Sequence, residues 1–161
     1  HKMMPKVRLD RAWALMRSGR EAAAGKAYTD LASDGSTAPE VFIAKIWLAD
    51  QNFNSVTNRQ KAEEIYQKIA AATNCPPYLR HRSQLMAGRA ALARDSYDDA
   101  RKSFVTLLDN TNVSESVRVH ATFALSDLTM IDLKVSPAGD LPEEKKQEKK
   151  RIHQATNNLF G

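Results

Sequence analysis

The sequence predicts an all-α fold, a short α-solenoid of stacked helical hairpins. Three observations predict it: residues recur at a fixed interval of 38, apolar residues follow helical spacing, and helix-forming residues far outnumber Gly and Pro. Six columns agree in one register: Ala24, Ala62 and Ala100; Tyr28, Tyr66 and Phe104; Leu31, Ile69 and Leu107; Pro39 and Pro77; Val41, Leu79 and Val117; Trp47, Leu85 and Phe123. Self-similarity of this length is typical of stacked-repeat proteins.

The first repeat, residues 5–37, should form two helices. We expect one helix from about Val7 to Ser18, a break at Gly19, and a second helix from about Glu21 to Ser33. The polar loop that follows ends in Thr37, whose hydroxyl can cap the next helix.

The second repeat, residues 38–76, begins with Pro39 in the first turn of its first helix, where a missing N–H costs nothing. Its two helices are separated by Gln51–Asn58, a stretch rich in Asn, Ser and Thr that predicts a longer, irregular connection. The segment 74–77, with Pro76 and Pro77, marks the boundary with the third repeat, because the residue before a proline is pushed out of the helical region.

The third repeat, residues 77–112, has its internal turn at Arg94–Ser96 and closes at Asn110–Asn112. Ser114 can then cap a closing helix over about 114–131. Three hairpins and one closing helix therefore complete the predicted stack.

A separate tail, residues 134–161, should follow the repeat domain of residues 5–133. Ser136–Asp140 is a cluster of helix breakers, and Glu143–Arg151 is a nearly continuous run of charge without an apolar face. We expect a linker and then a polar helix that either caps the open end of the stack or is mobile.

The repeat columns resemble the tetratricopeptide (TPR) pattern, most clearly in the third repeat. There Ala87-Gly88 matches the small positions of the first helix, Asp95–Tyr97 the turn, and Ala100 and Phe104 the second helix. The resemblance implies TPR-like hairpins whose first helices line a concave, protein-binding face. One departure is the period, because the family repeat is about 34 residues and the extra length here lies between hairpins.

A narrower likeness links Ala62–Ala70 and Pro77–Arg80 to bacterial membrane-anchored envelope TPR proteins, among them the ancillary subunit of the Sec translocon. Such proteins carry one N-terminal anchor, whereas this sequence holds no apolar run of the length that a membrane span needs. His1–Met3 looks like an expression junction. The localisation stays open: cytoplasmic, or periplasmic and envelope-anchored if an anchor was trimmed.

Composition excludes several classes of function. The net charge of +5, from 24 basic and 19 acidic residues, describes a mixed surface that only mildly favours anionic partners.

The single cysteine, Cys75, excludes an intrachain disulfide and a multi-cysteine metal site, and we expect Cys75 to be an unreactive loop residue. His81 and His120 occupy nearly equivalent positions in neighbouring repeats, but no third metal ligand is evident.

Catalysis finds little support in the sequence. No Ser/His/Asp arrangement, phosphate-binding loop or HExxH motif is readable, and adjacent carboxylates such as Glu63 and Glu64 diverge on a helix instead of converging. We therefore predict no catalytic residues, no metal, no cofactor and no enzymatic activity.

The TPR resemblance implies a groove lined by the first helix of each hairpin and by the closing helix. The candidate groove residues are Lys6, Leu9, Trp13, Arg17, Trp47, Gln51, Arg82, Leu85, Arg89, His120 and Phe123. Cations interleaved with large side chains suit a carboxylate or an acidic peptide with apolar anchors.

We expect a noncatalytic scaffold or adaptor that binds a peptide or protein segment on this concave face. Two alternatives stay open, an RNA-binding helical-repeat protein and a self-assembling structural subunit. The equivalent groove residues Lys6, Ala44 and Arg82 do not repeat a base-reading code, which argues against RNA. The partner and the oligomeric state are not determined by the sequence.

Overall fold

The computed structural model describes residues 3–135 together with residues 147 and 151. Its elements are α1 (Pro5–Arg17), α2 (Glu21–Ala32), α3 (Pro39–Phe53), the 3-10 turn η1 (Val56–Asn58), α4 (Arg59–Ala71), α5 (Pro77–Leu92), α6 (Tyr97–Asp109) and α7 (Glu115–Val135). The described residues hold no strand, so the predicted all-α class is confirmed. Apart from residues 134, 135, 147 and 151, the predicted tail lies outside the described residues.

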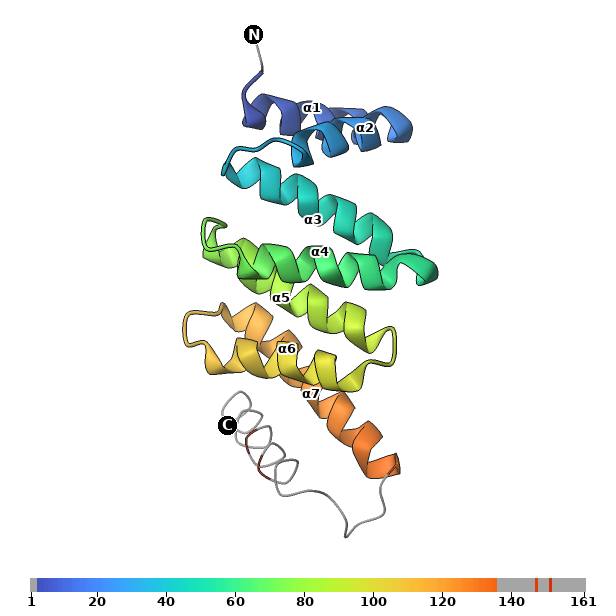
Figure 1. The fold of residues 1–161 in the computed structure, drawn as a ribbon, viewed down its shortest axis with the longest axis vertical. Coiled ribbons are helices and arrows are strands. Elements are labelled where there is room, and N and C mark those ends of the chain that lie inside the picture. Colours follow the sequence, from blue (N-terminus) through green and yellow to red (C-terminus); the bar gives the residue numbers. More distant parts are fainter. Residues whose placement is uncertain (1–2, 136–146, 148–150, 152–161) are drawn as a thin grey trace.

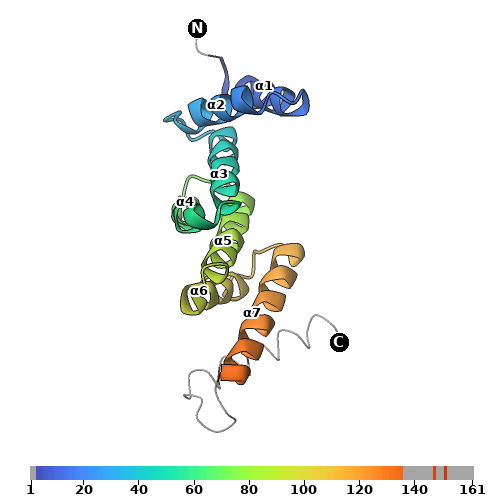
Figure 2. The same ribbon diagram turned by 90° about the vertical axis from the view of Figure 1, so that its right-hand side faces the viewer.

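The helices stack in chain order along the long axis of the molecule (Figure 1). Each helix packs against the next, and contacts also join α1 to α3, α3 to α5 and α5 to α7. The even-numbered helices α2, α4 and α6 do not contact one another. Figure 2 shows α4 and α6 on one side of the stack, with α5 and α7 on the other. The odd-numbered helices therefore lie closer together and form a common side.

One aromatic ring per hairpin joins it to the next hairpin. Tyr28, Tyr66 and Phe104 are 2%, 0% and 0% exposed, and each lies in its own hydrophobic cluster. Tyr28 shares a cluster with Val41 of α3, Tyr66 with Leu79 of α5, and Phe104 with residues of α7. The recurring columns that begin with Ala24, Tyr28 and Leu31 are thus buried in every repeat and pack the stack, whereas Pro39, Pro77 and Phe123 of other columns are exposed.

The helix ends follow the predicted breakers with two differences. Gly19 has φ +72°, a conformation that favours glycine, and Pro39 and Pro77 begin their helices. The prediction that Thr37 caps α3 is wrong, because the N-cap is Ala38 and no side chain caps this helix. The connection after α3 is also shorter than predicted, since α3 continues to Phe53 before η1.

Two inter-hairpin ion pairs occupy equivalent positions with their charges exchanged. Arg94 donates to the carboxylate of Glu63, with Nη2 2.5 Å from Oε2, and Arg101 pairs with Asp132. Glu63 precedes Arg101 by one 38-residue repeat, and Arg94 precedes Asp132 by the same interval. The Glu63–Arg94 pair therefore ties α4 of the second hairpin to the α5–α6 turn, and the Arg101–Asp132 pair ties α6 of the third hairpin to α7.

Gly88 is required by the close approach of α5 to α6. A Cβ at this position would lie 2.5 Å from the nearest atom of the buried Phe104 ring, whereas a Cβ at Gly25 would meet only Trp47, at 3.8 Å. We expect Gly88→Ala to lower the free energy of unfolding by about 1–3 kcal/mol, because the ring cannot move aside. We expect Gly25→Ala to raise it by about 0.5–1 kcal/mol through helix propensity. Urea denaturation of both variants tests this, and equal effects would contradict the packing described here.

The Glu63–Arg94 pair should contribute more to folding than a solvent-exposed pair. The matched control is Asp50–Arg82, 3.6 Å apart, whose side chains are 34% and 57% exposed. Double-mutant cycles with alanine, read by urea denaturation, should give a coupling of about 1.5–3 kcal/mol for Glu63–Arg94. The exposed pair should give about 0–1 kcal/mol. Similar coupling energies would show that burial does not strengthen the inter-hairpin pair.

Candidate functional site

The central helix α5 shows which surface the stack leaves open to solvent. Of its 16 residues only Pro77, Tyr78, Arg82 and Arg89 are exposed. Tyr78 and Arg82 are one turn apart, and Arg89 follows two turns later on the same face. The packing of α5 against its neighbours therefore leaves one narrow strip of side chains uncovered.

The same register marks a strip on each odd-numbered helix. We call these strips together the odd-helix face; its members are Lys6, Trp13 and Arg17 of α1, Trp47 and Gln51 of α3, Tyr78, Arg82 and Arg89 of α5, and His120, Phe123 and Asp127 of α7. All of them are exposed except Trp47, which is half-buried. Because the odd-numbered helices lie side by side, the strips adjoin one another.

Two predicted groove residues belong to the core instead. Leu9 and Leu85 are 4% and 6% exposed and lie in the hydrophobic clusters around Tyr28 and Phe104. Each turns inward to pack between helices, so neither can contact a ligand on the surface. The prediction that they line the groove is corrected on this ground.

Trp47 is fixed in place by the core, whereas Trp13 is open to solvent. The Trp47 ring stacks on Tyr28 with ring centroids 4.2 Å apart and an interplanar angle of 10°. Trp13 is 48% exposed and shares a shallow hollow of α1 with Asp10 and Arg17. The two tryptophans thus play different parts, one joining hairpins and the other presenting an indole at the surface.

A chain of polar contacts runs from the core to Arg82. The buried Tyr66 hydroxyl donates a hydrogen bond to Asp50 Oδ1, and Asp50 Oδ2 lies 3.6 Å from Arg82 Nη2. Burial, followed by the hydrogen bond to Asp50, raises the pKa of Tyr66, so this hydroxyl stays a donor. Asp50 therefore links the Arg82 guanidinium to a rigid core residue.

Asp50 and Tyr78 were not among the residues singled out from the sequence. Tyr78 could have been found from its place one turn before Arg82, on the same face of the helix. Asp50 had no comparable signal, because its role depends on Tyr66 and Arg82 from two other helices.

Unlike Arg82, Arg89 makes no ion pair with any residue that the structure describes.

The odd-helix face carries an excess of positive charge. Lys6, Arg17, Arg82 and Arg89 outnumber the acidic members of the region. Guanidinium groups bind carboxylates through paired, charge-assisted hydrogen bonds, and an exposed indole offers an apolar anchor. The chemistry available here is the binding of an acidic, partly apolar ligand.

The remaining titratable candidates lie elsewhere and are engaged by the fold. His81 Nε2 is 3.2 Å from the side-chain nitrogen of Asn110, and burial, together with Arg80, lowers the pKa of His81. Cys75, expected in a loop, is 3% exposed and packs in the cluster around Tyr66. Among the described residues, no group of three or more His, Cys, Asp or Glu side chains is placed to hold a metal ion.

Within the described part of the chain, none of the helices combines the length and apolar character of a membrane span. Neither a protein-family model, nor a curated protein, nor a solved structure matches the sequence.

Cys75 should be unreactive in the folded protein. Burial raises the pKa of its thiol, outweighing the opposite influence of Arg80 and Lys45, and the thiolate is the reactive form. We expect the native chain to react with Ellman's reagent at pH 8 at least about tenfold more slowly than the chain in concentrated urea. Equal rates in the two conditions would mean that the thiol is open to solvent.

Proposed function

We propose that this chain is a noncatalytic TPR-like adaptor that binds an acidic peptide segment of another protein on its odd-helix face. The observation that carries the proposal is the uncovered strip of α5, where Arg82 and Arg89 are exposed in a helix that is otherwise enclosed. A helix packed on its other faces can offer a ligand only this strip.

The positions of neighbouring helices support a ligand longer than a single residue. Contacts of α5 with α3 and α7 place the strips of three helices in succession, and α1 extends the series beyond α3. A peptide lying across them could place carboxylates on Arg82 and Arg89 and an apolar side chain near Trp13. Extended surfaces built from successive repeats are what stacked-repeat proteins use for binding.

The exposure of Arg82 supports a role in binding. Its side chain is 57% exposed and its contact with Asp50, at 3.6 Å, is a weak surface ion pair, so the guanidinium remains open to a ligand carboxylate. Arg89 supplies a second cation two helical turns away. Together they favour a ligand with two separated acidic groups.

The RNA alternative has weaker support. A base-reading repeat array presents equivalent polar side chains from successive units. Here the equivalent positions hold Lys6, Ala44 and Arg82, and Ala44 is fully buried. The middle repeat therefore has no side chain to contribute at this position.

Affinity of a selected peptide for charge-reversed variants tests the proposal. Peptides selected against the chain from a random phage-displayed library should be rich in Asp and Glu, and their affinity can be measured by fluorescence anisotropy. We expect Arg82→Glu with Arg89→Glu to weaken binding by about tenfold or more, through lost carboxylate pairing and added repulsion. The matched control is Lys61→Glu with Lys102→Glu, the same change of charge at exposed positions of α4 and α6.

The fluorescence of Trp13 tests whether the ligand binds near α1 without changing any charge on the protein. The chain contains two tryptophans, so Trp47→Phe leaves Trp13 as the sole indole. Ligand binding should shift the Trp13 emission to shorter wavelength and protect it from acrylamide. If the control pair weakens binding as much as the Arg82 and Arg89 pair, or if Trp13 emission does not change, the odd-helix face is not the binding surface.

A further inference from the structure

We infer that the chain has a second peptide-binding site, on the opposite side of the stack, which takes an apolar side chain flanked by carboxylates. The site is a cleft of about 540 Å³ between the α2–α3 loop, α3 and α4. It shares no residue with the odd-helix face.

The cleft exists because the first hairpin is joined to the second by a longer and differently filled loop. Residues 33–38 link α2 to α3. In Figure 2, α1 and α2 are seen from the side, whereas α4 is seen nearly along its axis, so the first hairpin is turned relative to α4. At the next junction, Cys75 is buried among the core residues. The equivalent residue one repeat earlier is Thr37, which is exposed and lines the cleft. Cys75 thus fills the space at the junction between the second and third hairpins, whereas Thr37 leaves the equivalent space at the first junction open to solvent.

The floor of the cleft is apolar. The half-buried Leu48 and Ile65 supply its accessible apolar surface, whereas Phe42 and Ile69 also line the cleft but are only 5% and 2% exposed. A ligand side chain entering the cleft would therefore leave water for contact with aliphatic and aromatic carbon, which is favourable in proportion to the apolar area buried.

The rim of the cleft is cationic. Lys45 and Lys68 both line it, and neither pairs with a carboxylate in the part of the chain that the structure describes. The Lys45 ammonium instead lies 5.4 Å from the centre of the Phe42 ring. Asp34, the one acidic residue of the lining, is already engaged by Arg8 at 2.5 Å and by the Ser36 N–H. The rim therefore attracts negative charge.

The cleft is suited to a peptide segment because its walls are open to solvent. Gly35, Ser36 and Thr37 on one wall and Lys68 on the other are all exposed. Its volume lies within the range of about 300–1,000 Å³ that ligand sites occupy. An open cleft of this size accepts one or two side chains of a longer chain that continues into solvent, and charge complementarity sets acidic residues beside them.

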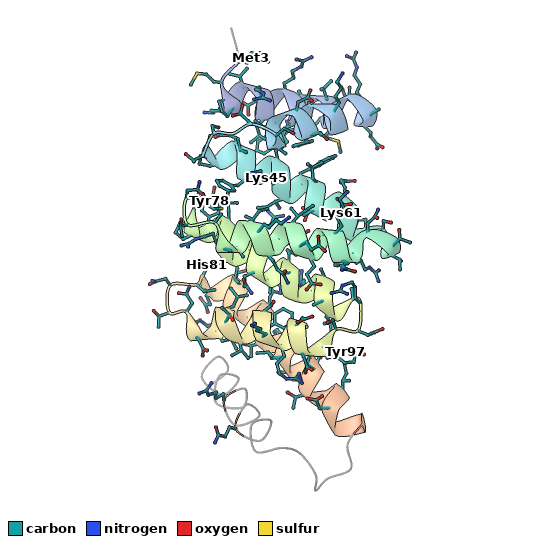
Figure 3. All side chains as sticks on the ribbon, viewed as in Figure 1. Met3, Lys45, Lys61, Tyr78, His81 and Tyr97 are labelled. Carbon is teal, nitrogen blue, oxygen red and sulfur yellow. The ribbon has the colours of Figure 1, made fainter. Side chains whose placement is uncertain are left out.

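The experiment separates this site from the odd-helix face by selecting peptides against the Arg82→Glu, Arg89→Glu variant. We expect the phage-displayed library to yield peptides with Leu, Ile or Phe next to Asp or Glu. Adding Lys45→Glu and Lys68→Glu should weaken their binding by about tenfold or more. Adding Thr37→Leu, which fills the cleft without changing charge, should weaken it as well. The control is Lys61→Glu with Lys102→Glu; Figure 3 shows Lys61 on α4, to the right of Lys45 and toward the α3–α4 connection.

The result that overturns the inference is equally specific. It fails if no peptide is selected, if the selected peptides bind the Lys45→Glu, Lys68→Glu variant unchanged, or if the control weakens binding as much. Decanoate, an apolar chain with one carboxylate, is titrated alone as a further probe. If decanoate saturates the cleft and the selected peptides do not compete with it, the ligand of the cleft is not a peptide. Thermal melting of each variant confirms that lost binding is not lost folding. The selection uses the Arg82→Glu, Arg89→Glu variant, so a failure to find cleft-binding peptides does not contradict binding on the odd-helix face. Likewise, a failure of the odd-helix face to bind peptides does not contradict binding in the cleft.

Discussion

The structure depends on the packing of one buried aromatic ring from the second helix of each hairpin. Tyr28, Tyr66 and Phe104 fill the space between each hairpin and the helix that follows it. Each ring needs room on the facing helix, and Gly88 shows how closely α5 approaches Phe104. This packing brings the odd-numbered helices together and keeps the even-numbered ones apart. The exposed strips that form the odd-helix face are what it leaves uncovered.

The first junction departs from the regularity of the others. Glu63–Arg94 ties the second hairpin to the α5–α6 turn and Arg101–Asp132 ties the third hairpin to α7, whereas the equivalent positions at the first junction hold Gly25 and Val56. Aromatic stacking of Trp47 on Tyr28 holds this junction instead. The cleft above α3 opens at the same place. Where the repeat pattern is relaxed, the chain gains a surface feature that its regular parts do not share.

Periodic packing could be predicted from the sequence because it uses the same columns in each repeat. The all-α class, the order of the helices and the buried rings all follow from that register. The groove was predicted less well, since Leu9 and Leu85 lie only about 40–60° around the helix from the exposed residues three and four positions away, a difference that columns alone do not resolve. Asp50 and the Lys45 cleft could not be found at all, because residues of separate helices create them.

We propose that one packing register both builds the stack and leaves the odd-numbered helices as its binding side. The most direct measurement is a backbone amide NMR titration of the isotope-labelled chain with a peptide that requires Arg82 and Arg89. We expect shift changes concentrated in α1, α3, α5 and α7, together with a change at the Trp13 indole N–H. Shift changes confined to α2, α4 and α6 would contradict it.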